Sequence, residues 1–264
     1  GELRSLLKGT ISRRELDIMV AETRKEKLKK NKAEMLKLSW HLPGSAWSMD
    51  VFQSHISGLS QDGFVLSVQD LTSGYKLPPL VTEREPKGVQ IASHLEHLFN
   101  RFGKPLFLKR DNGGNLNQSA INELLSGSYV LPINNHCYYA QYNGAMEHGQ
   151  GEYKQQLNKN YSNIASFNDF NRSVALAAHE LNHISRRNLA GDTSCKRFFQ
   201  KPLFSYSKRK RKEVFLWIYE RALDIVEKAA QIITAESAWR IACRIWLVKN
   251  GLLSISKNGE VLPY

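Results

Sequence analysis

The chain has 264 residues, a formal net charge of +12 and a pI near 9.6. Its hydrophobic content of 42% and its five tryptophans indicate a folded protein with a sizeable core and argue against a disordered chain. The excess of positive charge favours a polyanionic partner and makes nucleic acid the leading candidate, although a solvated basic surface would give the same count.

The cysteines and the hydropathy bear on metal sites, disulfides, cellular compartment and membrane association. The three cysteines, Cys137, Cys195 and Cys243, are widely spaced and form no CxxC pair, so the sequence indicates neither a zinc ribbon nor a disulfide framework. A reducing, cytoplasmic compartment fits this pattern. The sequence contains no run of apolar residues long enough to span a bilayer, and we therefore expect no association with a membrane.

The N-terminal part of the chain predicts a helix. Residues 12–38 contain no Gly or Pro and are rich in helix formers, and Ser12 with Glu15 forms a capping-box pattern. The many lysines at residues 25–32 fit a solvated face as well as a contact with the DNA backbone.

After a break at residues 41–45 the pattern changes to short apolar strands that alternate with helices. Five strands are predicted, at residues 47–52, 63–70, 74–81, 106–109 and 129–133. Helices are predicted at residues 86–102, 117–125, 144–160 and 169–186. Pro78 and Pro79 indicate that the third strand ends there or lies at a sheet edge. The first three strands are joined by short links, as in an antiparallel meander, and the whole order predicts an α/β layered domain.

The C-terminal part is predicted to be helical, with a terminal hairpin. The basic segment 196–212 has the composition of a linker that runs into a helix near Ser207. Thr234 is the expected N-cap of a further helix at residues 235–250. The pair Asn258-Gly259 between two short apolar runs is typical of a hairpin turn.

Three acidic residues stand out as candidate metal ligands. Asp50 lies within a predicted strand, Asp111 ends another, and Glu147 lies in the first turns of a later helix. Carboxylates brought together in this way are hard oxygen ligands that suit Mg²⁺ or Mn²⁺, whereas without a cation they would repel each other. Any single acidic residue is more often a helix cap or a surface group, however. The pair His179 and His183, four apart on a helix, could also bind metal, but helix packing is the commoner role.

Longer stretches around these residues carry a family resemblance. They are AWSMD ending at Asp50, VQDLTSGY with Asp70, LKRDNGG with Asp111, YNGAMEHGQGEYK with Glu147, and HELNHISRRNLAGDTSCKRF. In this order they resemble the catalytic core of the retroviral-integrase and bacterial transposase superfamily, the DDE group with a ribonuclease-H-like fold, from about Trp47 to Phe199. The thirty-five residues between Asp111 and Glu147 match the spacing that is the hallmark of this family.

The resemblance implies a ribonuclease-H-like layered domain, with a five-stranded mixed sheet and flanking helices. On this basis the chain divides into a helical N-terminal segment at residues 1–40, the catalytic core at 41–190, and a basic linker with a small α+β region at 191–264. It also implies that Asp50, Asp111 and Glu147 hold two Mg²⁺ or Mn²⁺ ions, with Asp50 bridging both.

The resemblance further implies contacts with DNA. Lys154 lies seven residues beyond Glu147, hence on the same helix face, and matches a DNA-contacting lysine of related integrases. Asn143 belongs to the family's segment just ahead of the glutamate and is a second candidate. The basic run that follows the core is expected to hold DNA phosphates through Lys208, Arg209, Lys210 and Arg211.

Two glycines depart from what a catalytic helix is expected to contain. Gly149 and Gly151 lie inside the helix of Glu147, where each costs about 1 kcal/mol relative to Ala. Gly151 also stands where related integrases carry a second lysine. They could let DNA approach closely, or loosen a helix that is not used in catalysis.

The function that the resemblance implies is that of a DNA transposase or integrase. Water first frees a 3′-hydroxyl, and that hydroxyl then attacks target DNA, with two metal ions and no covalent protein intermediate. The expected partners are transposon ends and target DNA, other copies of the chain in a multimer, and accessory transposition proteins. The expected location is the cytoplasm, at the bacterial nucleoid when bound to DNA. Two alternatives remain open: a nuclease of the same fold without strand transfer, and a domesticated core that binds DNA as a scaffold.

Overall fold

The computed structural model forms two compact units, residues 1–39 with 254–264 and residues 40–253. It describes the backbone of residues 37–56, 61–111, 114–134, 144–160, 164–200, 202, 204–229, 232–257 and 260–261. Most of the predicted N-terminal helix therefore lies outside the described residues. The prediction is wrong at its end, because Lys37 and Leu38 belong to a strand, β1 (Lys37–Trp40).

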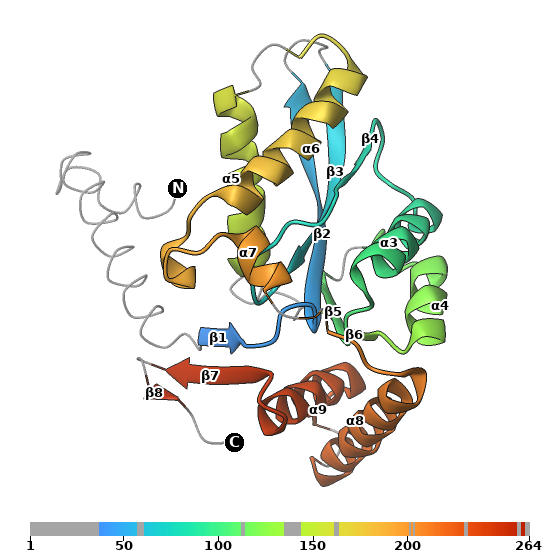
Figure 1. Ribbon diagram of the computed structural model, residues 1–264. Coiled ribbons are helices and arrows are strands. Elements are labelled where there is room, and N and C mark those ends of the chain that lie inside the picture. The colour runs from blue at the N-terminus through green and yellow to red at the C-terminus, as the bar shows by residue number, and fades with distance from the viewer. Residues whose placement is uncertain are drawn as a thin grey trace, which may run out of the picture. The chain divides into compact units, whose positions relative to one another are not determined.

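A mixed five-stranded sheet forms the centre of the larger unit, in the order β4-β3-β2-β5-β6 (Figure 1). Strand β2 pairs antiparallel with β3 and parallel with β5, while β3 pairs antiparallel with β4 and β5 pairs parallel with β6. The strands are β2 (Ala46–Ile56), β3 (Gln61–Asp70), β4 (Leu80–Thr82), β5 (Phe107–Arg110) and β6 (Leu131–Asn134). This confirms the ribonuclease-H-like layered fold.

The third predicted strand is shorter than expected. Only residues 80–82 form β4 at the sheet edge, and the earlier part makes a single bridge between Gln69 and Lys76. Pro78 and Pro79 separate the two pairings, because a proline has no N–H to donate to a ladder.

Two pairs of helices cover the two faces of the sheet. Helices α3 (Gly88–Phe102) and α4 (Ser119–Ser128) lie on one face, and α5 (Gly144–Asn160) and α6 (Phe167–His183) lie on the other (Figure 1). Side chains of a strand alternate between faces, and β2 follows this rule. Its Trp47 and Met49 join the core beneath α3 and α4, whereas Phe52 joins the core beneath α5 and α6.

The C-terminal helices begin at capped residues; the sequence predicted the cap at Thr234 and a helix start near Ser207. Thr193, Ser207 and Thr234 each accept a hydrogen bond from the backbone N–H three residues later, which satisfies an otherwise unpaired donor. They start α7 (Ser194–Phe199), α8 (Lys208–Lys228) and α9 (Ala235–Lys249). Helix α7 was not predicted, nor was the short 3₁₀ helix η2 (Arg187–Leu189) before it.

Helices α7 to α9 belong to the same compact unit as the sheet. The ring of Phe198 in α7 stacks on Tyr75, with centroids 4.6 Å apart. In α9 the indole N–H of Trp239 donates to the carbonyl of Pro132 in β6, at 2.8 Å. The domain boundary that the sequence placed near residue 190 therefore falls inside this unit.

The second sheet has the order β1-β7-β8, with β7 (Leu253–Lys257) antiparallel to β8 (Glu260–Val261). The pairing of Lys257 with Glu260 confirms the hairpin predicted around residues 258–259. Within the described part of the chain, no helix combines the length and the apolar character that a membrane crossing requires.

Candidate metal centre

The pairing of β2 with β5 runs up to the residues that precede Asp50 and Asp111. Met49 is in register with Arg110 on the parallel strand, and the two aspartates are the next residue of each segment. Neighbouring strands lie about 4.8 Å apart and alternate their side chains in step, so two residues in register project from the same face. That face is the one covered by α5 and α6, because Phe52, two residues after Asp50, packs beneath them.

Helix α5 contacts Asp50 directly. The side-chain amide of Gln150 donates to Oδ2 of Asp50 at 2.8 Å, while the backbone N–H of Val51 donates to Oδ1, also at 2.8 Å. Gln150 lies three residues after Glu147 and hence on the same helix face. The turn of α5 that contains Glu147 is therefore one turn from the contact with Asp50.

The complete three-carboxylate site stays a prediction. The backbone of residue 147 is described, but its side chain is not, and Asn143 lies outside the described residues. Among the side chains that are described, no three His, Cys, Asp or Glu residues are grouped so that they could hold a metal ion. The donor set nevertheless fits a hard divalent cation, since Asp50 and Asp111 offer carboxylate oxygens.

Gly149 allows α5 to approach the end of β3 closely. The residue is buried, and a Cβ added to it would lie 2.5 Å from Oε1 of Gln69 and 3.3 Å from Nζ of Lys76. Gly151 differs, because a Cβ there would meet nothing within 4 Å. The first glycine is thus explained by a close approach of helix and sheet; nothing in the structure explains the second.

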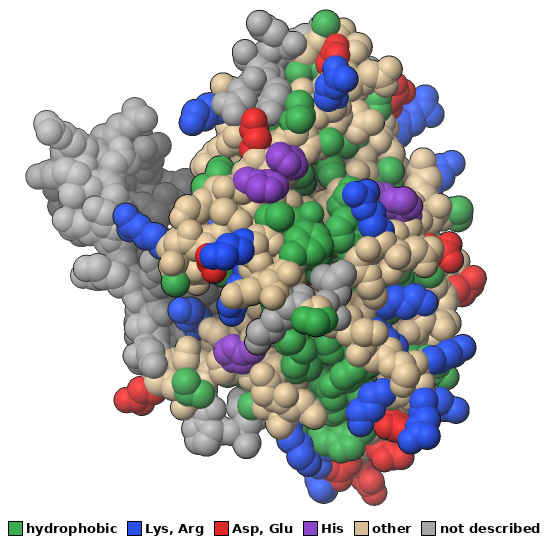
Figure 2. All heavy atoms as spheres, viewed as in Figure 1, with side chains coloured by type: hydrophobic (Ala, Val, Ile, Leu, Met, Phe, Trp, Pro, Cys, Tyr) green, Lys and Arg blue, Asp and Glu red, His purple; other side chains and the backbone are tan. Residues whose placement is uncertain are grey.

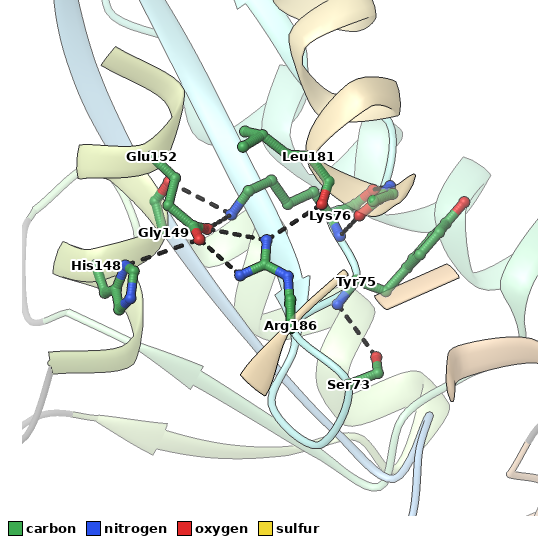
Figure 3. Close-up of polar contacts among 9 residues, drawn as sticks. Ser73, Tyr75, Lys76, His148, Gly149, Glu152, Leu181 and Arg186 are labelled. Carbon is green, nitrogen blue, oxygen red and sulfur yellow. Dashed lines mark hydrogen bonds and ion pairs between the residues drawn. The ribbon is translucent and has the colours of Figure 1, made fainter. Parts of the chain in front are cut away.

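A charged cluster that the sequence did not reveal lies where α5 comes close to the end of β3 (Figure 3). Lys76 and Arg186 both reach the carboxylate of Glu152, with Lys76 Nζ 3.0 Å from Oε2 and Arg186 Nη1 2.6 Å from Oε1. Lys76 is only 2% exposed, and its Nζ also donates to the carbonyl of Gly149 at 3.4 Å. The one signal in the sequence was a lysine within the otherwise apolar stretch GYKLPPLV.

In this cluster, burial and the neighbouring charges shift the pKa values in opposite directions. Burial lowers the pKa of Lys76, and the neighbouring Glu152 only partly opposes this shift. For Glu152 burial acts to raise the pKa, but the hydrogen bonds and charges of Arg186 and Lys76 outweigh it, so the pKa is lowered. The carboxylate is therefore held ionised between two cations.

Asp70 anchors the turn after β3. Its buried carboxylate accepts from the N–H of Gly44 at 2.7 Å and from the N–H and hydroxyl of Ser73 at 2.8 and 2.7 Å. Burial raises the pKa of Asp70 to about 6, although these hydrogen bonds act to lower it. Because Gly44 precedes β2, the contact ties the start of the central strand to the end of its neighbour.

Arg110 organises the loop that follows Asp111. Its buried guanidinium donates to the side chain of Asn134 in β6 and to the carbonyl of Leu116, both at 2.9 Å. It also donates to the side chains of Asn117 at 2.9 Å and Asn122 at 2.8 Å. Burial lowers the pKa of Arg110.

The predicted DNA contacts divide into exposed and buried residues. Lys154 is exposed, with Nζ 5.7 Å from the ring centroid of Phe52. Lys208, Arg209 and Lys210 are exposed in the first turn of α8. On the face drawn in Figure 2, Lys and Arg side chains are spread among other groups rather than gathered into one patch.

Arg211 corrects the prediction for the basic run, because it is buried. It donates to the carbonyls of Tyr206 at 3.1 Å, Pro105 at 2.7 Å and Lys104, and burial lowers its pKa to about 10. A guanidinium engaged in this way holds α8 against the segment before β5, and we leave it out of the DNA surface.

His179 and His183 pack on each other in α6. Their ring centroids are 4.3 Å apart, and Nδ1 of His183 lies 2.7 Å from the carbonyl oxygen of His179, in hydrogen-bonding position. Both side chains are exposed, so the contact is between neighbouring turns of one helix, and the role of the pair stays a prediction.

Comparison with solved structures agrees with this fold. No family model and no curated protein sequence matches the chain. Among solved structures, the simian T-cell lymphotropic virus intasome in complex with the PP2A regulatory subunit B56 gamma matches with a TM-score of 0.54 and 18% identity, over 66% of this chain and 62% of that chain. The chain thus spans less than two thirds of the length of that protein.

Two further matches are catalytic cores of retroviral integrases. The HTLV-2 integrase catalytic core domain in complex with magnesium, in its dimeric form, has a TM-score of 0.47 and 20% identity over 58% of this chain and 95% of that chain. The catalytic core domain of BIV integrase has the same TM-score and identity over 60% of this chain and 95% of that chain. At these identities the similarity concerns the fold alone, and of the three structures only the intasome chain has a TM-score above 0.5.

Proposed function

We propose that the chain is a polynucleotidyl transferase of the DDE transposase and integrase type, which cleaves DNA and joins the freed 3′ end to a target. The observation that carries this proposal is the register of β2 with β5, which pairs the residues just before Asp50 and Asp111, together with the contact of Gln150 with Asp50. These observations support a site to which Asp50, Asp111 and the first turn of α5 each contribute a carboxylate. The ribonuclease-H-like fold is compatible with the proposed cleavage and joining of DNA.

The carboxylates of Asp50, Asp111 and Glu147 are the proposed ligands of two Mg²⁺ or Mn²⁺ ions. When bound, such ions activate the attacking hydroxyl and stabilise the departing oxygen of a phosphodiester. The protein orients the ligands: the N–H of Val51 fixes one oxygen of Asp50, and Arg110 fixes the loop that continues from Asp111.

DNA is the proposed substrate, with transposon ends and target DNA as its two forms. The net charge of +12 favours a polyanion, and Lys154, on the helix that carries Glu147, is exposed. Lys208, Arg209 and Lys210 offer further phosphate contacts at the start of α8. Two ends must be joined, so we propose a multimer of the chain on DNA, with accessory transposition proteins, in the cytoplasm at the bacterial nucleoid.

The test is an assay of DNA end processing. Purified protein is incubated with Mg²⁺ and labelled DNA from the two flanks of its gene, and the products are separated on a denaturing gel. Wild-type protein is expected to yield cleaved and joined strands, and Asp50→Asn is expected to yield neither. Asp62→Asn is the matched control, because it removes a partly exposed carboxylate from the neighbouring strand β3, where it contacts His55 and Gln53.

The products also separate the alternatives. Cleaved strands without joined strands would leave a nuclease of the same fold and remove strand transfer. DNA binding without cleavage, in Mg²⁺ and in Mn²⁺, would overturn the enzymatic proposal and favour the scaffold.

A further inference from the structure

The cluster of Lys76, Glu152 and Arg186 joins three elements that the chain brings together from distant positions. Lys76 belongs to the segment between β3 and β4, Glu152 to α5, and Arg186 to the segment after α6. Both oxygens of Glu152 are engaged, one by each cation at 3.0 and 2.6 Å, and Arg186 Nη2 adds a second, longer contact at 3.3 Å. The carboxylate therefore has a fixed direction as well as a fixed position.

The backbone of Lys76 and the guanidinium of Arg186 are themselves held in place by hydrogen bonds. The N–H of Lys76 donates to the side-chain oxygen of Asn182 in α6, and the side-chain amide of Asn182 donates back to the carbonyl of Lys76, both at 2.8 Å. The guanidinium of Arg186 donates to the carbonyl of Leu181 at 3.2 Å. The two cations, from the segment before β4 and the segment after α6, thus form a held pair between which the carboxylate of α5 fits.

Stability alone gives little reason for such a cluster. Removing charges from water costs free energy that their attraction only partly returns, and apolar side chains of similar volume often serve a fold as well or better. A largely buried ion cluster has one property that apolar packing lacks, because its hydrogen bonds depend on the relative placement of the groups.

The ion cluster fixes the placement of the first half of α5. Gly149 lies against Gln69 and Lys76 with no room for a side chain, and Glu152 is one turn further on the same side of the helix. Gln150, between them, contacts Asp50. A shift or rotation of the helix that broke the contacts of Glu152 would also move Gln150, and with it the turn of Glu147.

We propose that Lys76, Glu152 and Arg186 are positioning residues that set the rotation and height of α5 on the sheet, and so hold the turn of Glu147 at Asp50. The inference deepens the proposed function and rests on it for the role of Glu147. The register of α5 itself is a property of the protein without metal or DNA.

The experiment compares the wild-type chain with an apolar triple variant, Lys76→Met with Glu152→Met and Arg186→Met. This variant leaves no unpaired buried charge, so it is expected to keep its fold and its melting temperature. A second variant, Arg186→Lys, keeps the charge but loses the two-pronged geometry of the guanidinium. The matched control is Glu180→Gln, which changes a carboxylate that accepts from Gln156 further along the same pair of helices.

Two readouts are taken on the full chain. Hydrogen–deuterium exchange of the amides in the first half of α5 is expected to rise about 10-fold in the triple variant. The affinity for Mn²⁺, measured by electron paramagnetic resonance, is expected to fall by about 10–100-fold, the usual effect of losing groups that orient metal ligands. In the DNA assay kcat is expected to fall while KM stays near the wild-type value, and Glu180→Gln is expected to resemble the wild type throughout.

The outcomes separate this inference from the proposed function. A folded triple variant, or a folded Arg186→Lys variant, with wild-type exchange in α5 and wild-type affinity for Mn²⁺ would overturn the positioning role. If the wild type shows no binding of Mn²⁺ that depends on Asp50, the metal function fails, and the exchange of α5 alone then decides whether the cluster sets its register.

Discussion

Replacing Gly149 by alanine places a methyl group where the structure leaves no room for one. The new Cβ would lie 2.5 Å from Oε1 of Gln69, far inside contact distance, and 3.3 Å from Nζ of Lys76. Both neighbours are buried, and Lys76 is fixed by Glu152, so neither can simply turn into solvent. The same change at Gly151, two residues later in the same helix, meets nothing within 4 Å.

The two variants therefore separate two contributions to the free energy of unfolding. Alanine in place of glycine within a helix gains about 1 kcal/mol, and this gain applies at both positions. Overpacking of a tight contact costs about 1–3 kcal/mol, and this cost applies at Gly149 alone. We expect Gly151→Ala to stabilise the protein by about 1 kcal/mol, and Gly149→Ala to range from neutral to a loss of about 2 kcal/mol.

Urea unfolding followed by far-UV circular dichroism measures both values in one set of conditions. The difference between the two variants, about 1–3 kcal/mol, is the quantity that tests the packing of α5 on β3. Equal stabilisation by both alanines would refute the reasoning, because it would mean that α5 does not lie against Gln69 and Lys76. Activity adds a second measure: Gly149→Ala is expected to lose DNA cleavage even where it folds, and Gly151→Ala is expected to keep it.

Three further predictions concern single residues of the same region. Lys154→Ala is expected to weaken DNA binding and to reduce the slope of log affinity against log salt by about 1, as one phosphate contact is lost; an unchanged slope in a fluorescence-anisotropy titration would place Lys154 outside the DNA surface. Arg110→Met is expected to lower the free energy of unfolding in urea by at least about 2 kcal/mol, because four acceptors lose a charged donor, and a loss below about 0.5 kcal/mol would contradict its role. For Asp70 the folded-state pKa of about 6 exceeds the usual 3.8, so its contribution to stability is present below pH 4 and is lost as the pH rises through 6. Relative to Asp70→Asn, the free energy of unfolding of the wild type is expected to fall by about 2 kcal/mol between pH 4 and 7, and parallel pH profiles of the two proteins would argue against the shift.

Local patterns in the sequence predicted the elements whose causes are local. The helix starts after Ser207 and Thr234 follow from a side chain that caps its own backbone three residues on. The hairpin around residues 258–259 follows from the turn residues themselves. The prolines at 78 and 79 marked where the third strand is interrupted, although the prediction still made that strand too long.

Interactions between distant parts of the chain could not be predicted in this way. Arg211 is indistinguishable by composition from Lys208, Arg209 and Lys210, and only the return of α8 to residues 104–105 buries it. The cluster around Glu152 depends equally on tertiary contacts, because no periodicity relates Lys76 to a helix that begins near residue 144.

The candidate site falls between these two cases. Asp50 and Asp111 could be paired only through the family resemblance, and the strand register pairs the two residues that precede them. Gly149 had no explanation in the sequence, and the close approach of α5 to Gln69 provides one.

The most direct measurement is the anomalous scattering of a crystal of the protein soaked in Mn²⁺. We predict two peaks about 4 Å apart, with oxygens of Asp50, Asp111 and Glu147 as their ligands. Ordered Mn²⁺ elsewhere in the crystal with none at Asp50 and Asp111, or a carboxylate of Glu147 held away from them when the ions are bound, would contradict it.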